Sequence, residues 1–185
     1  MLLVALVVYY YAGMSDVIIK VIADGAVIPV VLLGVWALLF RLPKRSNRLE
    51  AYSRILMAGL TAYMVAKLIG AVYQPQSMRP FELLGQTAGA SYLNNPGFPS
   101  DHVLFCMAIT LAVWFETRRK WLGYTLLALT LVVGVGRIVA LVHTPFDVIG
   151  GLIIAFAGVG WYLQRPPKPK KAATEARQNG NHAVK

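Results

Sequence analysis

Charged residues are scarce in this sequence, and their scarcity argues against a soluble protein. They make up 14% of the 185 residues, whereas a soluble domain carries about 25%. Hydrophobic residues reach 57% of the chain. The length favours a single domain, and the composition indicates a membrane protein.

The sequence also has only one cysteine and no basic segment at its amino terminus. The single cysteine, Cys106, lies in an apolar run, so no disulfide within the chain is possible. Residues 1–12 are apolar but too short to cross a ~30 Å hydrocarbon core, and no basic segment precedes them as in a cleaved signal peptide. We expect residues 1–13 to form a short interfacial helix, or to be dispensable if the protein starts at Met14.

Longer apolar stretches follow, and we interpret them as membrane-spanning helices, for which roughly 17–25 residues are typical. They cover residues 17–40, 52–73, 102–117, 121–142 and 146–163. Open sheet edges are not tolerated in hydrocarbon, and the stretches lack the alternation of a barrel. Interior glycines permit close helix packing at Gly134, Gly136, Gly150 and Gly151. The sequence therefore predicts an all-α, polytopic transmembrane bundle of about five spanning helices within residues 14–164.

The basic residues are distributed unevenly along the chain. All but four of the 18 lie in two connections between expected spans, 41–54 and 118–120, or in the segment 165–185. If the spans alternate in direction, these segments share one side, which the positive-inside rule identifies as cytoplasmic. This topology accounts for the net charge of +10 without a nucleic-acid partner. It predicts a multi-pass plasma-membrane protein with a disordered basic tail, 165–185, against the anionic inner leaflet.

Four basic residues do not follow this distribution: Lys20, Lys67, Arg79 and Arg137. Lys20 lies near the start of the first expected span, where the membrane interface accommodates it. The other three lie at or near the outer ends of spans, where the rule predicts few cations. A charge deep in a membrane helix costs at least ~2.5–3.5 kcal/mol on insertion scales, so it usually marks a functional site.

Two histidines and one carboxylate lie at the same outer level. His102 opens the third expected span, His143 lies where the fourth ends, and Asp147 opens the fifth, whereas His182 belongs to the tail. Together with the three outer cations, these side chains form a set that binds an anion and carries its own acid and base.

Phosphate chemistry suits this set of side chains. Arginine presents a planar fork of donors to phosphate oxygens, and lysine a point charge. Ser100 is a natural N-cap for the third span, whose first turn offers backbone N–H donors to a phosphoryl oxygen. An imidazole acts as nucleophile or general acid near neutral pH. Two histidines on separate helices and one carboxylate are a weak metal signal, so neither a metal nor another cofactor is expected.

Each residue also has a purely structural interpretation when it is taken alone. Residues 144–147, Thr-Pro-Phe-Asp, form a capping box with proline at the first helical position, so Asp147 would serve only to start a helix. Arg79 would anchor to headgroups, and Lys67 would reach the interface along its aliphatic stem. The coincidence of six ionisable side chains on one face favours a functional site.

The same residues fall into three short motifs. They read Arg79-Pro80 with Lys67 twelve residues before the arginine, then Pro99-Ser100-Asp101-His102, then Gly136-Arg137, five residues, His143, three residues and Asp147. This arrangement resembles the signature of the PAP2 (type 2 phosphatidic acid phosphatase and haloperoxidase) superfamily, which reads K-x6-R-P, P-S-G-H and S-R-x5-H-x3-D. Three positions depart from the pattern: Gly136 replaces its serine, Asp101 its glycine, and Val72 its lysine.

The resemblance implies a metal-independent phosphatase with a covalent intermediate. His143 would attack phosphorus to form a phosphohistidine, and Asp147 would orient this imidazole. His102 would protonate the leaving oxygen and then activate water. The phosphoryl oxygens would be held by Arg79, Arg137, Ser100 and Lys67.

The implied site opens at the outer membrane–water boundary, which suits a phosphate at headgroup level and a lipid tail between helices. The Pro-Ser-Asp-His variant and the short chain resemble the bacitracin-resistance type of undecaprenyl-diphosphate phosphatase, so a polyprenyl diphosphate, undecaprenyl diphosphate, is the leading substrate. Phosphatidate, phosphatidylglycerophosphate or another lipid monophosphate is the alternative within the enzyme class. A phosphotransferase with a lipid acceptor and a non-catalytic membrane protein that binds lipid phosphate also stay open.

Overall fold

The computed structural model describes residues 16–43, 47–74, 78–93 and 97–164, and every regular element within these ranges is a helix. The elements are α2 (Asp16–Lys20), a π-helical turn (Val21–Gly25), α3 (Val27–Phe40), α4 (Arg48–Val72), α5 (Pro80–Leu83), α6 (Asp101–Thr117), α7 (Lys120–Val139), α8 (Pro145–Ile154), a 3₁₀ turn (Ala155–Gly158) and α9 (Val159–Leu163). The segments predicted as an interfacial helix, 1–13, and as a basic tail, 165–185, lie outside the described residues.

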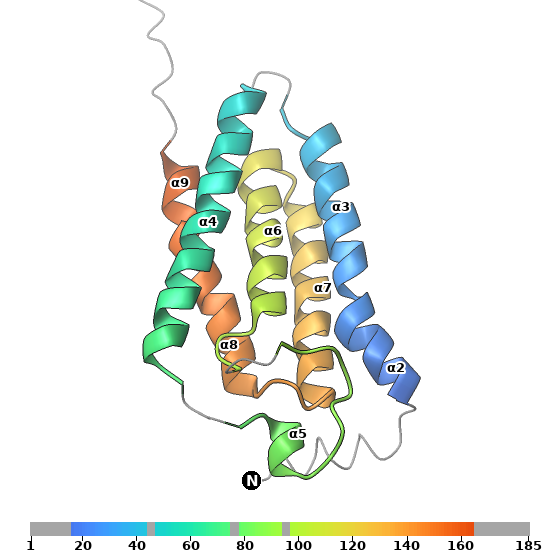
Figure 1. Ribbon diagram of the computed structural model, residues 1–185. Coiled ribbons are helices and arrows are strands. Elements are labelled where there is room, and N and C mark those ends of the chain that lie inside the picture. Colours follow the sequence, from blue (N-terminus) through green and yellow to red (C-terminus); the bar gives the residue numbers. More distant parts are fainter. Residues whose placement is uncertain (1–15, 44–46, 75–77, 94–96, 165–185) are drawn as a thin grey trace, which may run out of the picture.

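The long helices form one bundle with α6 at its centre (Figure 1). Helix α6 packs against α3, α4, α7 and α8. Four helices of the described chain are long and apolar enough to cross a membrane: Val17–Phe40, Arg48–Val72, Lys120–Val139 and Pro145–Leu163. The 17-residue α6 runs among them along the same direction. The predicted all-α membrane bundle is confirmed.

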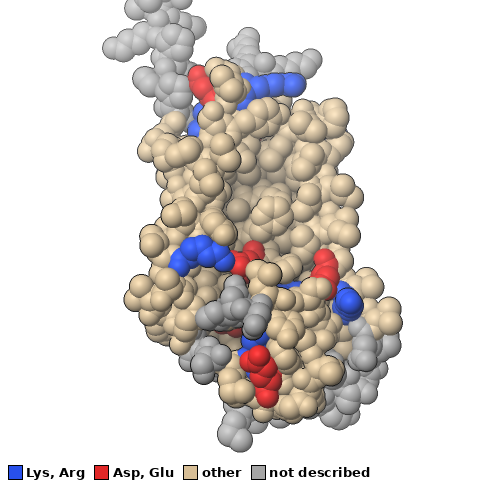
Figure 2. Space-filling model, viewed as in Figure 1, with Lys and Arg blue, Asp and Glu red and all other residues tan. Residues whose placement is uncertain are grey.

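The outer surface of the bundle is apolar where lipid would surround it. Leu32, Leu60, Val135 and Ile153 project from four different helices and are 65%, 49%, 58% and 64% exposed. Figure 2 shows charged side chains at the two ends of the bundle and a broad uncharged band between them. A water-exposed surface of this kind would be strongly unfavourable, so the band indicates the hydrocarbon-facing part of the protein.

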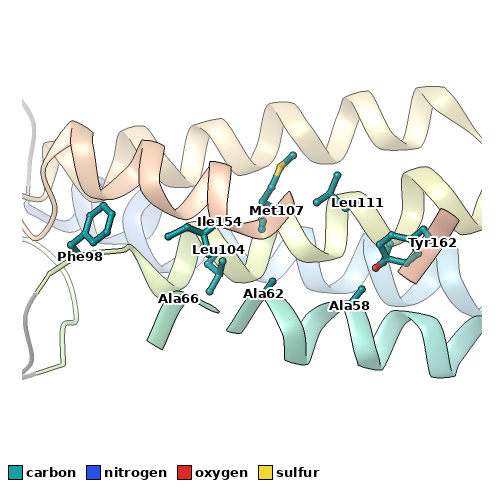
Figure 3. Packing of buried hydrophobic residues seen from close by; sticks show 11 residues of the cluster. Ala58, Ala62, Ala66, Phe98, Leu104, Met107, Leu111, Ile154 and Tyr162 are labelled. Carbon is teal, nitrogen blue, oxygen red and sulfur yellow. The ribbon is translucent and has the colours of Figure 1, made fainter. Parts of the chain in front are cut away.

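Small residues set the distance between α4 and the elements that pack on it. Ala58, Ala62 and Ala66 recur every four residues on α4 and belong to the largest core cluster of the described residues, where Ala62 and Ala66 lie near Leu104 of α6 and Ala58 near Tyr162 of α9 (Figure 3). A Cβ at Gly158 would lie 2.3 Å from the carbonyl oxygen of Ala58, so only glycine fits there. Such small-residue contacts are typical of membrane helices, whose association depends on close packing.

The predicted close approaches at four glycines are also confirmed. A Cβ added at Gly134, Gly136, Gly150 or Gly151 would lie 2.8, 2.9, 2.4 or 2.8 Å from a neighbouring atom. The atom nearest to a Cβ added at Gly151 is the carbonyl oxygen of Ser100. The missing side chain therefore lets α8 pack directly against the beginning of α6. The contact brings two of the sequence motifs together.

The two ends of the bundle differ in their chemistry. One end holds the described residues of the basic connections, including Arg41, Arg48 and Arg118, and Arg118 ends α6 in a left-handed conformation with φ 55°. The opposite end holds α5, the start of α6 and the turn between α7 and α8. The predicted assignment of these ends to the cytoplasmic and outer sides stays a prediction.

Candidate active site

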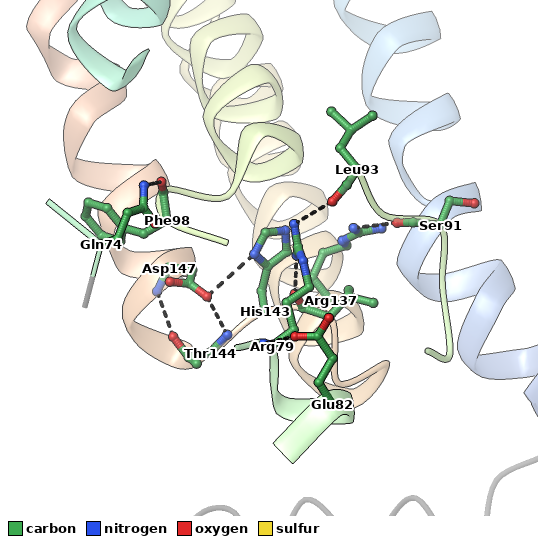
Figure 4. Close-up of polar contacts among 11 residues, drawn as sticks. Gln74, Arg79, Glu82, Ser91, Leu93, Phe98, Arg137, His143, Thr144 and Asp147 are labelled. Carbon is green, nitrogen blue, oxygen red and sulfur yellow. Dashed lines mark hydrogen bonds and ion pairs between the residues drawn. The ribbon is translucent and has the colours of Figure 1, made fainter. Parts of the chain in front are cut away.

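His143 lies in the turn that joins α7 to α8. The turn includes Leu141 with φ 59°, a conformation that residues other than glycine seldom adopt, and α8 then begins at Pro145. Thr144 donates its N–H to Asp147 Oδ2 at 2.7 Å, and the Asp147 N–H donates to Thr144 Oγ1 at 3.2 Å (Figure 4). The predicted capping box is therefore present.

Asp147 faces His143 with the same oxygen that caps the helix. Its Oδ2 lies 3.6 Å from His143 Nδ1, slightly longer than a hydrogen bond, and both side chains are buried. This geometry directs Nδ1 toward the carboxylate and leaves Nε2 as the imidazole nitrogen for other chemistry. The structural and the functional interpretation of Asp147 therefore describe one arrangement.

The imidazole of His143 is held in its neutral form at ordinary pH. Burial lowers the pKa of His143 below its usual value, the nearby charges of Arg137 and Arg79 lower it further, and the Asp147 carboxylate opposes this shift only in part. A neutral imidazole keeps the lone pair that a nucleophile requires.

Arg79 is tied to the backbone around His143. Its Nη1 donates to the carbonyl oxygen of Val142 at 2.6 Å, and its Nη2 donates to the carbonyl oxygen of Leu93 at 3.1 Å. Its own N–H donates to Glu82 Oε2 at 2.7 Å at the start of α5. Burial lowers the pKa of Arg79 from its usual value, yet a guanidinium remains charged in proteins. A cation is therefore fixed beside the His143 turn.

Arg137 is held by a carboxylate that the sequence analysis did not connect with it. The guanidinium is 1% exposed; Nη1 donates to Asp24 Oδ1 at 2.8 Å and Nη2 to the carbonyl oxygen of Ser91 at 2.7 Å. The Ser91 N–H donates to the other oxygen of Asp24 at 3.0 Å. Asp24 thus orients the arginine and anchors the loop before α6, although it lies 113 residues from Arg137 in sequence.

The glycine that replaces the signature serine belongs to the same contact. A Cβ at Gly136 would lie 3.0 Å from backbone atoms of Ala23, in the π-helical turn that also carries Asp24. A serine side chain at this position would push that turn away. We interpret Gly136 as the residue that lets Asp24 come within reach of Arg137.

A polar cavity of about 360 Å³ brings together most of the predicted site residues. Its walls include five of the seven, namely Lys67, Arg79, His102, Arg137 and His143, and also Asp101. Asp147 adjoins the cavity through His143. The two imidazoles, on α6 and in the α7–α8 turn, therefore open onto one space, as the sequence predicted.

Ser100 occupies the predicted N-cap position of α6, but its side chain makes no capping bond. Its Oγ is buried without a hydrogen-bond partner among the described residues, and the residue is not part of the cavity wall. Its N–H donates instead to the carbonyl oxygen of Asp147 at 3.0 Å. Ser100 thus connects the second motif to the third through the backbone.

An apolar groove of about 550 Å³ lies beside the polar cavity, between α3, α4 and α6. Its walls include Leu38 of α3, Ile55, Leu60 and Tyr63 of α4, and Leu104 and Ala108 of α6. Figure 2 shows a recess in the uncharged band of this face. Asp101 lines both the groove and the polar cavity.

Comparison with known proteins identifies the family. The sequence pattern of the PAP2 superfamily matches residues 51–171. The chain belongs to the PAP2 superfamily. It is therefore a membrane phosphatase, and the resemblance found in the three motifs is confirmed.

Two relatives of this PAP2 protein are known by name. The chain is 29% identical over 152 residues to undecaprenyl-diphosphatase BcrC of Bacillus subtilis (strain 168), a match that covers 79% of this chain and 72% of the relative. It is 34% identical over 85 residues to the putative undecaprenyl-diphosphatase YbjG of Escherichia coli (strain K12), covering 43% of this chain and 40% of the relative. No solved structure matches the chain.

We predict that Asp24→Asn weakens this PAP2 site without touching the signature. The amide keeps the shape of the side chain but loses the charge that holds the Arg137 guanidinium. A hydrogen bond to a charged group contributes enough stability that its loss corresponds to a roughly tenfold fall in kcat/KM for phosphate release. The melting temperature in detergent should fall as well. Glu50→Gln, an exposed carboxylate at the opposite end of the bundle, is the matched control and should leave kcat/KM unchanged, although it too loses a pairing with an arginine, Arg54.

Proposed function

We propose that this PAP2 protein removes the terminal phosphate of a polyprenyl diphosphate, with undecaprenyl diphosphate as the leading substrate. The observation that supports this most is the junction of two spaces of opposite character. The polar cavity holds three cations and two imidazoles, and the apolar groove beside it runs along the membrane helices. A lipid with a charged head and a long hydrocarbon tail fits both spaces at once, and the names of both relatives point to such a lipid.

The proposed reaction has two steps on one phosphorus atom. His143 Nε2 attacks the terminal phosphorus, an N–P bond forms, and the P–O bond to the lipid-side phosphate breaks. His102 gives its proton to the leaving oxygen. His102 then takes a proton from water, the resulting hydroxide attacks phosphorus, and the N–P bond breaks to release inorganic phosphate. Arg79 and Arg137 stabilise the charge on the equatorial oxygens in both steps.

Asp147 has a positioning role in this proposal. Its carboxylate orients the imidazole of His143 through Nδ1 and stabilises the positive charge that the ring acquires when Nε2 bonds to phosphorus. Ser100 does not need to contact the substrate for this scheme, because its buried side chain lies outside the cavity wall.

The proposed topology follows from the two ends of the bundle. The polar cavity lies at the end away from the basic connections, and the positive-inside rule places those connections in the cytoplasm. We therefore propose a plasma-membrane protein whose active site opens at the outer face, with residues 165–185 on the cytoplasmic side.

The proposal is tested with purified full-length protein in detergent and a panel of lipids. Undecaprenyl diphosphate, phosphatidate and phosphatidylglycerophosphate are offered in parallel, with EDTA present, and released phosphate is measured. We expect the diphosphate to give the highest kcat/KM and EDTA to leave it unchanged. Preference for a monophosphate lipid would refute the substrate. A strict divalent-metal requirement would refute the mechanism, and the absence of turnover on every lipid would favour a non-catalytic protein.

A further inference from the structure

Lys67 and Asp101 form an ion pair at the junction of the polar cavity and the apolar groove. Lys67 Nζ donates to both carboxylate oxygens of Asp101 at 2.9 Å, and it lies 5.2 Å from the ring centre of Tyr63. Lys67 lines the cavity, Tyr63 lines the groove, and Asp101 lines both. The pair therefore stands where the head of a bound lipid would meet its tail.

The same two residues are departures from the PAP2 signature. Asp101 replaces a glycine, and Lys67 lies five residues earlier on α4 than the signature lysine. Because an α-helix rises about 1.5 Å per residue, this change moves the ammonium group roughly 7–8 Å along α4. The move is toward the groove, whose α4 wall consists of residues that precede Lys67 in sequence. Val72, at the signature position, is 90% exposed. The two departures thus meet in one contact.

The Lys67–Asp101 pair is suitably placed to bind the second phosphate of a diphosphate lipid. When its terminal phosphate lies against His143 and its tail in the groove, the lipid-side phosphate lies between them, at the Lys67–Asp101 pair. An ammonium group carries three N–H donors. Asp101 accepts from it at both carboxylate oxygens, and it also fixes the direction of a long and otherwise mobile side chain. The lipid-side phosphate can therefore bind Lys67 while Asp101 still orients it.

We propose that Lys67, positioned by Asp101, binds the phosphate that stays on the lipid and so selects diphosphates over monophosphates. This inference rests on the proposed function and deepens it. A monophosphate lipid with its only phosphate at His143 brings hydrocarbon to the ion pair, removes water from two charges and supplies no anion in return. A diphosphate lipid supplies phosphate oxygens at the same point. Selectivity arises from both contributions.

The test compares two lipids that share one tail, farnesyl diphosphate and farnesyl phosphate. The full-length protein and its Lys67→Met variant are assayed for phosphate release, and the ratio of kcat/KM for diphosphate over monophosphate is determined. Loss of a charge-assisted contact made by one lipid only should lower this ratio by about 10–100-fold. Lys67→Arg should restore most of it. Lys20→Met, another exposed cation near the same end of the bundle, is the matched control and should leave the ratio unchanged.

Asp101→Asn tests the positioning role separately. It removes the carboxylate charge that fixes Lys67 but leaves the lysine present, so KM for farnesyl diphosphate should rise while kcat stays close to that of the parent protein. An equal fall of kcat/KM for both lipids in Lys67→Met would show that Lys67 contacts the attacked phosphate, and an unchanged ratio would show that it contacts neither. Either result overturns the inference and leaves the proposed phosphatase activity intact. A parent protein that releases phosphate from neither lipid would overturn both.

Discussion

His143→Ala is expected to reduce phosphate release by about 10⁴-fold or more, since removal of a covalent nucleophile leaves only the binding and electrostatic contributions of the site. The structure supports this size of effect because His143 is buried and neutral and has Asp147 at its Nδ1. Phosphate release from undecaprenyl diphosphate by purified variant and parent is the measurement. The variant should still insert into the membrane and elute from size exclusion like the parent.

The matched control for this prediction is His182→Ala, in the segment predicted to be a basic tail. It changes the same residue type, and turnover should stay at the level of the parent protein. Turnover of His143→Ala close to that of the parent would mean that another group attacks phosphorus or that the site acts without a covalent intermediate. Loss of activity in both variants would point to a general effect of removing histidine rather than to the nucleophile.

His102→Ala is expected to slow turnover by about 10²–10⁴-fold, the usual contribution of a general acid and base. His102 is the second residue of α6 and is half-buried. It lies in the wall of the cavity that His143 also lines. Its two proposed tasks separate experimentally. A substrate with a good leaving group, p-nitrophenyl phosphate, needs no proton for the first step but still needs an activated water for the second.

The variant should therefore release p-nitrophenol in a rapid burst, followed by slow steady turnover. The size of the burst should equal the concentration of active protein, because each molecule forms one phosphoenzyme and then stalls. Steady turnover without a burst in the His102→Ala variant would show that the His102 imidazole is not needed to activate water. Full activity on the lipid substrate would exclude it from both steps.

The helices and the gathering of the signature residues were predictable because they depend on local patterns. Apolar stretches of spanning length predicted the helices to within a few residues, as with 102–117 against Asp101–Thr117. Spacing within one helix or turn fixed the relation of His143 to Asp147, four residues apart. Alternation of the spans then placed the start of α6 and the α7–α8 turn at the same end, so the two histidines met.

The partners of the cations were not predictable in the same way. Asp24 belongs to none of the sequence motifs, and its contact with Arg137 depends on a π-helical turn and on close packing at Gly136. Asp101 was recognised only as a replacement for the glycine of the signature, whereas it pairs with Lys67. These contacts join residues far apart in sequence, and their geometry depends on how whole helices pack. The departures from the signature were a useful signal for these contacts. Gly136 and Asp101 both depart from it, and each lies at one of the two contacts.

The most direct test of the phosphatase mechanism is to trap the phosphorylated protein. His102→Ala is mixed with ³²P-labelled p-nitrophenyl phosphate, whose leaving group needs no proton, quenched within the first turnover, and digested for peptide mapping. The account predicts label on the peptide that contains His143, stable in alkali and lost in acid as for a phosphorus–nitrogen bond, and no label when His143→Ala is added to the same chain. Label that survives acid, or that persists in the double variant, would contradict it.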